Sequence, residues 1–268
     1  EYLGKALKKN VARNQVVIAS KVYFNEGRLS RQAIMREIDG TLSRLGTDYL
    51  DLYIIHRFDY DTPIEETMEA LHDLVKAGKV RALGASAMYG YQFYNMQLAA
   101  RDNGWTPFSA MENHYNLLYR EDERELLPIC KQMRVSLMPY SPLAAGHLAR
   151  PQWKSESLRG TTDRVAMGKY DKTEAEDMQI VKRVAELAEK YNCKMSQIAI
   201  AWQWAKGILS PIIGATKTQY LDDSAGAFDI KLTAEDLAYL EEPYVPHEIV
   251  GAIDKNPAQG VILLDEKK

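Results

Sequence analysis

Six short apolar runs recur along the chain, with helical patterns between them, at residues 15–20, 50–55, 80–85, 109–112, 135–139 and 210–214. Runs of this length and composition are typical of buried β-strands. Each run ends at or shortly before a polar or chemically useful side chain: Lys21, His56, Ser86, Glu112 with Asn113, Tyr140 and Lys217. Parallel sheets gather function at the C-terminal ends of their strands, so these side chains are candidates for one site.

The segments between the apolar runs carry start and stop signals of helices. Ser30 predicts the N-cap of a helix over 31–45 that stops before Gly46. The string Thr62-Pro63-Ile64-Glu65 predicts a capping box, with proline at the first helical position, for a helix that runs to Gly78. Further helices are expected to begin at two later caps, namely Ser196, whose helix reaches Lys206 before Gly207, and Thr233.

The alternation of strands and helices predicts an α/β fold with a parallel sheet and helices packed outside it. Open doubly wound sheets and closed (β/α)8 TIM barrels both place function at strand C-terminal ends. The open type normally carries a Gly-x-Gly-x-x-Gly turn after its first strand, and this sequence has none. The 268 residues also lie close to the ~250 of a typical barrel. We therefore predict a single barrel domain over residues 1–268.

Charge and composition argue against several classes of partner. The net charge is −3 and the pI is about 6.0, so no basic surface for nucleic acid is expected. No apolar stretch reaches the roughly 18 residues of a membrane span, and no signal peptide is recognisable. The five histidines and the two cysteines, Cys130 and Cys193, lack metal-binding spacing. We expect a metal-free protein in the reducing cytoplasm.

The longest segment without strand character joins Tyr140 to the helix that is expected near Thr173. It is rich in glycine, proline and threonine. Loops of this length in a compact domain are functional lids or are disordered. Because this loop leaves the edge where the candidate residues gather, we predict a lid, which would form part of the substrate pocket between Ala144 and Tyr170.

Taken together, the strand ends and their flanking strings resemble the aldo-keto reductase superfamily, in particular its aryl-alcohol dehydrogenase-like and voltage-gated potassium channel β-subunit-like branches. The resemblance runs in order over nearly the whole chain. It is carried by the strings ASK (19–21), LSRLGTDYLDLYIIHRFD (42–59), TPIEETMEALHDLVKAGKVRALGAS (62–86), ENHYNLLYRE (112–121), MPYSPLAAG (138–146) and PIIGATK (211–217).

This resemblance implies NADPH-dependent reduction of aldehydes or ketones, or the reverse oxidation of alcohols including aryl alcohols, without a metal. The family's catalytic set is an aspartate, a tyrosine, a lysine and a histidine. By resemblance, Lys21 is the lysine and His56 is the histidine. Hydride transfer to a carbonyl leaves negative charge on oxygen, which a positioned proton donor must stabilise. A nearby ammonium lowers the pKa of a tyrosine donor, and the histidine orients the substrate oxygen.

The resemblance also assigns a cofactor site. Ser86 and Glu112 take positions that contact the nicotinamide carboxamide, although relatives have asparagine where Ala87 follows and glutamine in place of Glu112. A carboxylate accepts from the amide but donates only when protonated. Asn113 has a structural alternative as a cap.

Tyr140 resembles the aromatic residue that stacks on the nicotinamide ring, with a core tyrosine as the alternative. The remaining implied contacts are Ser141, Pro142, Leu143 and Gly146 along the pyrophosphate, and Gly214, Ala215, Thr216, Lys217, Gln219, Asp222 and Asp223 at the adenosine end. Lys217 and the helix start after it favour a 2′-phosphate, hence NADP(H) over NAD(H). Candidates for the substrate wall are Phe24, Arg57 and Tyr89.

The start of the chain matches the middle of the family pattern. Residues 1–7 resemble the family's E-x-L-G-x-A-L, which follows the segment that carries the catalytic aspartate and tyrosine. Six strands are found where the barrel needs eight. We therefore expect an incomplete barrel that lacks its first two strands, through truncation, an incomplete gene model or an omitted leading segment, and that is weak as a reductase. The alternatives are a non-catalytic NADP(H)-binding regulatory subunit and an inactive fragment. The sequence predicts no oligomeric state.

Overall fold

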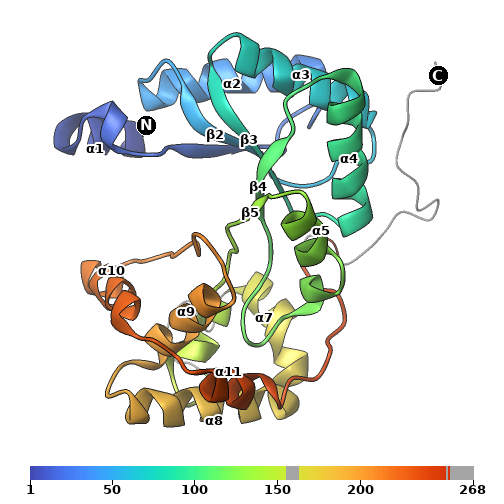
Figure 1. Ribbon diagram of the computed structural model, residues 1–268. Coiled ribbons are helices and arrows are strands. Elements are labelled where there is room, and N and C mark those ends of the chain that lie inside the picture. The colour runs from blue at the N-terminus through green and yellow to red at the C-terminus, as the bar shows by residue number, and fades with distance from the viewer. Residues whose placement is uncertain (155–162, 252, 254–268) are drawn as a thin grey trace. The chain divides into compact units, whose positions relative to one another are not determined.

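The computed structural model describes residues 1–154, 163–251 and 253 (Figure 1). Its strands are β1 (Ala19–Val22), β2 (Leu50–Ile55), β3 (Val80–Ser86), β4 (Phe108–Glu112) and β5 (Ser136–Leu137). The α-helices are α1 (Tyr2–Asn10), α2 (Arg31–Leu45), α3 (Ile64–Lys76), α4 (Gly90–Asn103), α5 (Leu126–Gln132), α7 (Arg164–Tyr170), α8 (Glu174–Lys190), α9 (Met195–Ala205), α10 (Thr218–Ala225) and α11 (Ala234–Glu241). The 3-10 helices are η1 (Arg13–Gln15), η2 (Glu121–Arg124), η3 (Ala144–Ala149), η4 (Asp171–Thr173) and η5 (Gly226–Asp229).

The chain divides into two compact units. The first contains Glu1–Met111 and Ile129–Val135, and the second contains Glu112–Pro128 and the described part of 136–254. The strand order is β1-β2-β3-β4-β5, the order of the chain, and β1, β2 and β3 are parallel. This parallel arrangement with intervening helices confirms the predicted α/β class. The described strands number five, whereas a closed barrel has eight.

In the first unit, α2, α3 and α4 pack beside one another and against the strands (Figure 1). The prediction for α2 is confirmed, because Ser30 Oγ accepts from Ala33 N at 3.4 Å and Gly46 ends the helix at φ 68°. The capping box at Thr62 is wrong. The Thr62 hydroxyl donates instead to Asp59 Oδ2 at 2.8 Å, so α3 begins at Ile64 with Pro63 as its N-cap residue.

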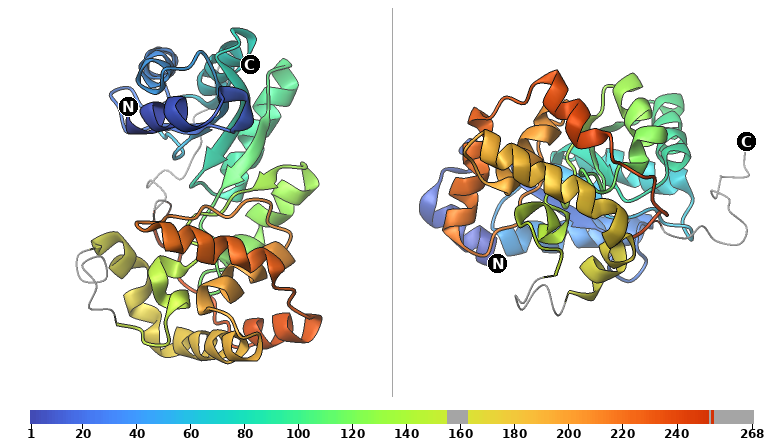
Figure 2. Two further views of the ribbon diagram at one scale, coloured as in Figure 1. Left: turned by 90° about the vertical axis from the view of Figure 1, so that its left-hand side faces the viewer. Right: turned by 90° about the horizontal axis from the view of Figure 1, so that it is seen from below.

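In the second unit, α8 lies beside α9 and α11, and these helices enclose an apolar core (Figure 2). The largest buried side chain of this core is Trp202 on α9. Helix α9 begins at Met195, one residue before the expected cap Ser196, because Lys194 N donates to Gln197 Oε1 at 2.9 Å. Thr233 caps α11 as predicted, with Asp236 N donating to Thr233 Oγ1 at 3.2 Å.

Three of the expected strands are shorter than predicted or are not formed. The run 15–20 begins in η1, and Ile18 N donates to the Asp51 side chain and not to a neighbouring strand. Strand β1 therefore begins only at Ala19. The run 135–139 is reduced to β5. The strand expected over 210–214 is wrong, because only Ile212 N, which donates to Pro139 O at 2.9 Å, bonds to the segment of β5. Pro211 has no N–H to donate, and β5 is too short to support a ladder.

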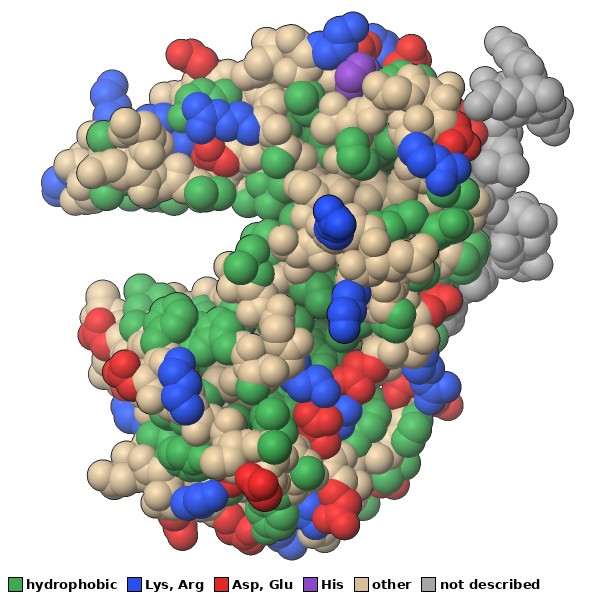
Figure 3. Space-filling model, in the orientation of Figure 1, with side chains coloured by type: hydrophobic (Ala, Val, Ile, Leu, Met, Phe, Trp, Pro, Cys, Tyr) green, Lys and Arg blue, Asp and Glu red, His purple; other side chains and the backbone are tan. Residues whose placement is uncertain are grey.

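The expected lid contains regular structure on both sides of residues 155–162, which lie outside the described residues. Before them the chain forms η3, and after them it forms α7 and η4. Helix α8 then begins at Glu174, directly after Thr173, as predicted. The second unit also exposes apolar side chains over α10, where Tyr220 and Leu221 are 42% and 52% exposed (Figure 3). Over the described ranges, no helix has both the length and the apolar character needed to cross a bilayer.

Candidate active site

Strand register places three of the predicted site residues of the first unit on one face of the sheet. Lys21 pairs with Ile54, and Ile54 pairs with Gly84 on the next strand. His56 lies two residues after Ile54, and Ser86 lies two residues after Gly84. Because side chains alternate along a strand, Lys21, His56 and Ser86 share this face at the C-terminal ends of β1, β2 and β3.

His56 is fixed at the end of β2. Its backbone N–H donates to Val22 O at 2.9 Å, which extends the pairing with β1 by one bond. The Phe24 ring meets the imidazole edge to face at a centroid distance of 5.0 Å. Burial lowers the pKa of His56, and the positive charges of Lys21 and Arg57 lower it further. The imidazole is therefore neutral near pH 7 and able to donate a hydrogen bond to a substrate oxygen.

Two of the three expected wall residues lie beside His56. The Arg57 guanidinium carbon is 4.8 Å from the centroid of the Phe24 ring. That ring is 65% exposed, so it presents an apolar surface next to the imidazole. Tyr89 instead precedes α4, where its ring stacks on Tyr91 at 6.0 Å. The structure thus brings Phe24, Arg57 and His56 together, and the contacts described for Tyr89 lie at the start of α4.

A buried carboxylate that sequence reasoning missed organises the loops around these residues. Asp59 is only 4% exposed and accepts from three donors. Leu29 N and Asp61 N donate to it at 3.1 and 3.0 Å, and the Thr62 hydroxyl donates at 2.8 Å. Asp59 therefore ties the loop after β1 to the loop after β2. The sequence held a hint of this role, because Asp59 lies only three residues after His56, in the loop that follows β2.

In the second unit, the end of β4 leads to Glu112 and Asn113, both buried. Asn113 Nδ2 donates to Asp122 Oδ2 at 2.8 Å, and Asn113 O accepts from Tyr140 N at 2.9 Å. Burial raises the pKa of Asp122 to about 7. These bonds link Asn113 to Asp122 and to Tyr140, and the Asn113 side chain forms no capping bond, because among the described residues its Oδ1 has no hydrogen-bond partner.

A buried polar network lies behind the predicted cofactor loop, and sequence reasoning did not find it. The Tyr170 hydroxyl lies 2.8 Å from His114 Nε2 and 3.0 Å from Asn116 Nδ2. Asn116 Nδ2 also donates to Ser141 O at 2.9 Å. The His114 ring stacks on Tyr140 with an interplanar angle of 6° and a centroid distance of 5.3 Å. The string ENHYN (112–116) offered a hint. Several polar residues in succession directly after a buried strand cannot all reach solvent, so some of them must form hydrogen bonds inside the protein.

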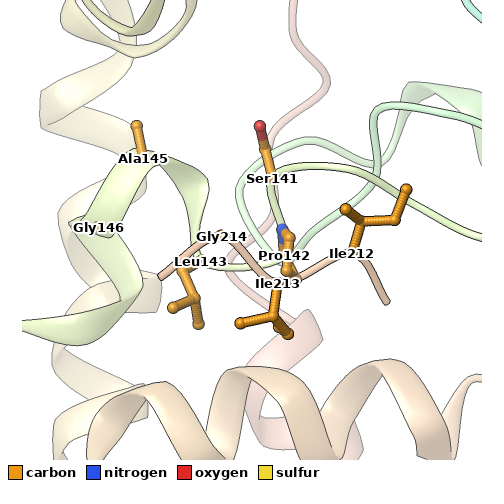
Figure 4. A pocket seen from close by; sticks show the side chains of 8 residues that line it. All are labelled: Ser141, Pro142, Leu143, Ala145, Gly146, Ile212, Ile213 and Gly214. Atoms are coloured by element: carbon orange, nitrogen blue, oxygen red, sulfur yellow. The ribbon is translucent and has the colours of Figure 1, made fainter. Parts of the chain in front are cut away.

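The loop after Tyr140 and the segment 212–214 line one pocket of about 210 Å³. Figure 4 shows that the side chains of Leu143 and Ile213 project to the same side of the pocket, and that Gly214 passes next to Leu143. Ser141 directs its hydroxyl to the opposite side. The complete lining is Ser141, Pro142, Leu143, Ala145, Gly146, Ile212, Ile213 and Gly214. Five of the predicted cofactor contacts therefore line this pocket. They are the four pyrophosphate contacts and, from the adenosine end, Gly214.

The backbone of this loop is unusual. Ser141, Ala144, Ala145 and Gly146 all have positive φ, at 58°, 46°, 55° and 99°. The N–H groups of Ala144 and Gly146 donate to Ser141 O and Leu143 O at 3.0 and 2.8 Å, so hydrogen bonds within the loop hold this backbone. A Cβ on Gly146 would lie 2.7 Å from Arg150 Nη1, which donates to Gly146 O at 2.7 Å. Among the described residues, the buried Nε of Arg150 has no hydrogen-bond partner.

The remaining predicted adenosine contacts lie on and before α10. Lys217 is exposed and directly precedes the helix, with its ammonium 5.9 Å from the Tyr220 ring. Asp223 forms an ion pair with Lys194 at 2.6 Å. The other members, all exposed, are Ala215, Thr216, Gln219 and Asp222. An exposed lysine at a helix start can bind a phosphate, whereas Asp223 is already neutralised. The roles of these residues stay predictions.

The chain is similar to known proteins over most of its length. The aldo/keto reductase family model matches residues 1–244. An aldo-keto reductase of Fusarium vanettenii is 47% identical over 233 residues, which are 87% of this chain and 62% of the relative. The versiconal hemiacetal acetate reductase of Aspergillus parasiticus is 42% identical over 274 residues, which cover 93% of this chain and 80% of that protein. A Schizosaccharomyces pombe protein that carries an aryl-alcohol dehydrogenase name is 40% identical over 94% of this chain and 79% of its own length.

The structure comparison agrees. The crystal structure of a thermostable aldo-keto reductase with the inhibitor epalrestat superposes with a TM-score of 0.73 at 28% identity, over 90% of this chain and 76% of that chain. This match confirms the predicted α/β fold of the aldo-keto reductase type. The chain spans 62% of the length of its Fusarium relative. Its sequence, its strand-end residues and its fold agree in one assignment: the chain belongs to the aldo/keto reductase family.

Proposed function

We propose that this chain is part of an NADP(H)-dependent oxidoreductase that reduces aldehydes or ketones and reverses the reaction with alcohols, including aryl alcohols. The observation that carries the proposal is the pocket formed by residues 141–146 and 212–214. Its lining includes four of the residues expected along a pyrophosphate, and the exposed Lys217 follows three residues after Gly214. Lysine at a helix start favours a 2′-phosphate, so the cofactor is NADP(H).

The residues of the first unit supply part of the chemistry. The cofactor, when bound, supplies or accepts the hydride. Neutral His56 donates a hydrogen bond to the carbonyl oxygen and orients it. Lys21 provides positive charge beside the forming alkoxide and favours the deprotonated form of a phenol donor. Within residues 1–268, the family's catalytic aspartate and tyrosine have no counterpart, so these 268 residues alone should turn over substrate weakly.

A second function is favoured by the division of the site. The pocket and Tyr140 lie on the second unit, which contains neither Lys21 nor His56. Cofactor binding at this pocket is therefore separable from the catalytic pair in this proposal. A protein that binds NADP(H) through these residues and uses its occupancy to regulate a partner is the alternative.

Nucleotide titration tests the proposal. NADPH should quench tryptophan fluorescence of the chain on binding, and NADH should bind more weakly. Replacing Lys217 with alanine should weaken NADPH binding by roughly 10-fold and leave NADH unaffected, because one charge-assisted phosphate contact is lost. The matched control is Lys182→Ala, an exposed lysine on α8. Absence of NADPH binding would contradict both functions, and binding without carbonyl reduction would favour the regulatory one.

We make three further proposals, on domain organisation, location and substrate class. One family model spans residues 1–244, so we propose that both units belong to a single aldo-keto reductase domain. We propose a cytoplasmic location, where thiols stay reduced, because neither Cys130 nor Cys193 forms a disulfide. The substrate is a small carbonyl compound or alcohol.

A further inference from the structure

A guanidinium group without an anionic partner lies beside His56. Arg57 is half-buried, and its guanidinium carbon lies 4.8 Å from the centroid of the Phe24 ring. Across the described residues, no carboxylate pairs with Arg57 and no acceptor takes a hydrogen bond from its side chain. The contact with Phe24 uses the π electrons of the ring, so the N–H donors of the guanidinium stay available. Their planar arrangement matches the two oxygens of a carboxylate.

The acidic side chains that follow Arg57 in the sequence already pair with another arginine. Asp59 Oδ1 and Asp61 Oδ2 lie 3.6 and 2.5 Å from Arg28 Nη1. Asp59 also accepts three hydrogen bonds within the same loops. These two carboxylates therefore compensate Arg28 and leave Arg57 without an ion pair.

An apolar ring connects this guanidinium to the imidazole. The Phe24 ring contacts both groups, lies 5.0 Å from the His56 ring and is 65% exposed. Burial lowers the pKa of His56, and the positive charges of Lys21 and Arg57 lower it further, so both charges act at the imidazole. All four residues belong to the first unit. They offer a hydrogen-bond donor, an apolar surface and a cation in that order.

We propose that Arg57 is a specificity-determining residue that selects aromatic carbonyl compounds and alcohols with a carboxylate on the ring. The inference rests on the proposed function, in which His56 orients the reacting oxygen. The aromatic ring of the substrate packs against Phe24, and its carboxylate accepts from the N–H groups of Arg57. The carboxylate supplies the ion pair that Arg57 lacks and offsets positive charge next to His56. A neutral substrate gains only the apolar contact.

Two alcohols of nearly equal size test this preference. The anionic probe is para-(hydroxymethyl)benzoate, the neutral one is para-(hydroxymethyl)benzamide, and neither can form an imine with Lys21. Calorimetry on the full chain should show that the benzoate binds roughly 3-fold to 30-fold more tightly, the range between exposed and partly desolvated charge pairs. Arg57→Met should abolish the preference. Arg57→Lys keeps the charge without the planar donors and should retain part of it.

The matched control removes a positive charge at the opposite edge of the sheet. Lys76 is exposed at the end of α3, before β3 begins, so Lys76→Met should keep the full preference for the benzoate. If Lys76→Met loses the preference as Arg57→Met does, net charge and not Arg57 causes it, and the inference is overturned.

The imidazole provides a second measurement at the site itself. Without ligand, NMR titration of Arg57→Met should show a higher pKa for His56 than in the wild-type protein, because one nearby positive charge is removed. The benzoate should raise the pKa of His56 in the wild-type protein, because it brings negative charge, and should leave it unchanged in Arg57→Met.

The outcomes separate this inference from the proposed function. If the wild-type chain binds the two probes equally or binds neither, the inference is overturned, whereas the proposed function is decided by NADPH binding. A preference for the benzoate that persists in Arg57→Met would also overturn the inference, because another group would then bind the carboxylate. Absence of NADPH binding would overturn the proposed function and, with it, the assignment of the carboxylate to a substrate.

Discussion

Replacing Tyr170 with phenylalanine should destabilise the second unit through the loss of a single hydroxyl. The ring is 2% exposed, so phenylalanine fills the same space and leaves no cavity. The hydroxyl is shared by His114 Nε2 at 2.8 Å and Asn116 Nδ2 at 3.0 Å. A buried polar group that loses its partner costs about 1–3 kcal/mol. Two such groups are affected, although Asn116 Nδ2 keeps its bond to Ser141 O, so we expect a loss of about 2–4 kcal/mol.

Urea unfolding followed by tryptophan fluorescence measures this loss, because Trp153 and Trp202 lie in the core of the second unit. The slope of the unfolding free energy against urea concentration should not change, because the wild-type protein and the variant bury the same surface on folding. Tyr220→Phe is the control, because this tyrosine is 42% exposed on α10. A loss below about 0.5 kcal/mol for Tyr170→Phe, comparable to a neutral surface change, would refute the reasoning that the hydroxyl holds the network together.

Three further changes test other parts of the structure. Asp59→Ala removes the acceptor of three loop donors and should cost roughly 2–4 kcal/mol in urea unfolding, with a smaller loss pointing to water as a substitute acceptor. Gly146→Ala should weaken NADPH binding and lower the melting temperature, because φ is 99° and the new Cβ would lie 2.7 Å from Arg150 Nη1. Burial opposes protonation of His247, but the hydrogen bond and charge of Asp177 raise its pKa above the ordinary value. The pair therefore stabilises the fold below about pH 6.5 and loses this contribution as the pH rises through the folded pKa, so the destabilisation of His247→Gln in urea should be larger at pH 6 than at pH 9.

The sequence predicted most of the first unit because its signals there are local. Ser30 and Gly46 mark both ends of α2, and the run 50–55 is β2 with the bounds expected of it. The register of β1, β2 and β3 then places Lys21 and His56 on one face, as the pattern of strand ends implied. These features depend on neighbours within one β-α unit, which a single sequence displays.

Features that depend on distant partners were not predicted. The run 210–214 has the composition of a strand, but strand formation needs a ladder partner, and β5 provides only Pro139 O for Ile212. The Thr62 hydroxyl was expected to cap a helix and instead bonds to Asp59, because a charged acceptor competes with the helix start. The contact of Lys169 with Tyr140 joins two segments whose spacing in the sequence carries no periodic signal.

The network of Asn116, His114 and Tyr170 holds the backbone of the pocket loop in place. Ser141 has a positive φ, a conformation that costs a non-glycine residue on the order of 1–3 kcal/mol and persists only when its surroundings enforce it. Asn116 supplies that constraint by donating to Ser141 O, and it is itself fixed by Leu118 N and by the Tyr170 hydroxyl. The backbone that is proposed to bind the cofactor is therefore held by side chains that do not line the pocket. Since these side chains act together on one loop, replacing any one of them should alter the pocket even though none of them lines it.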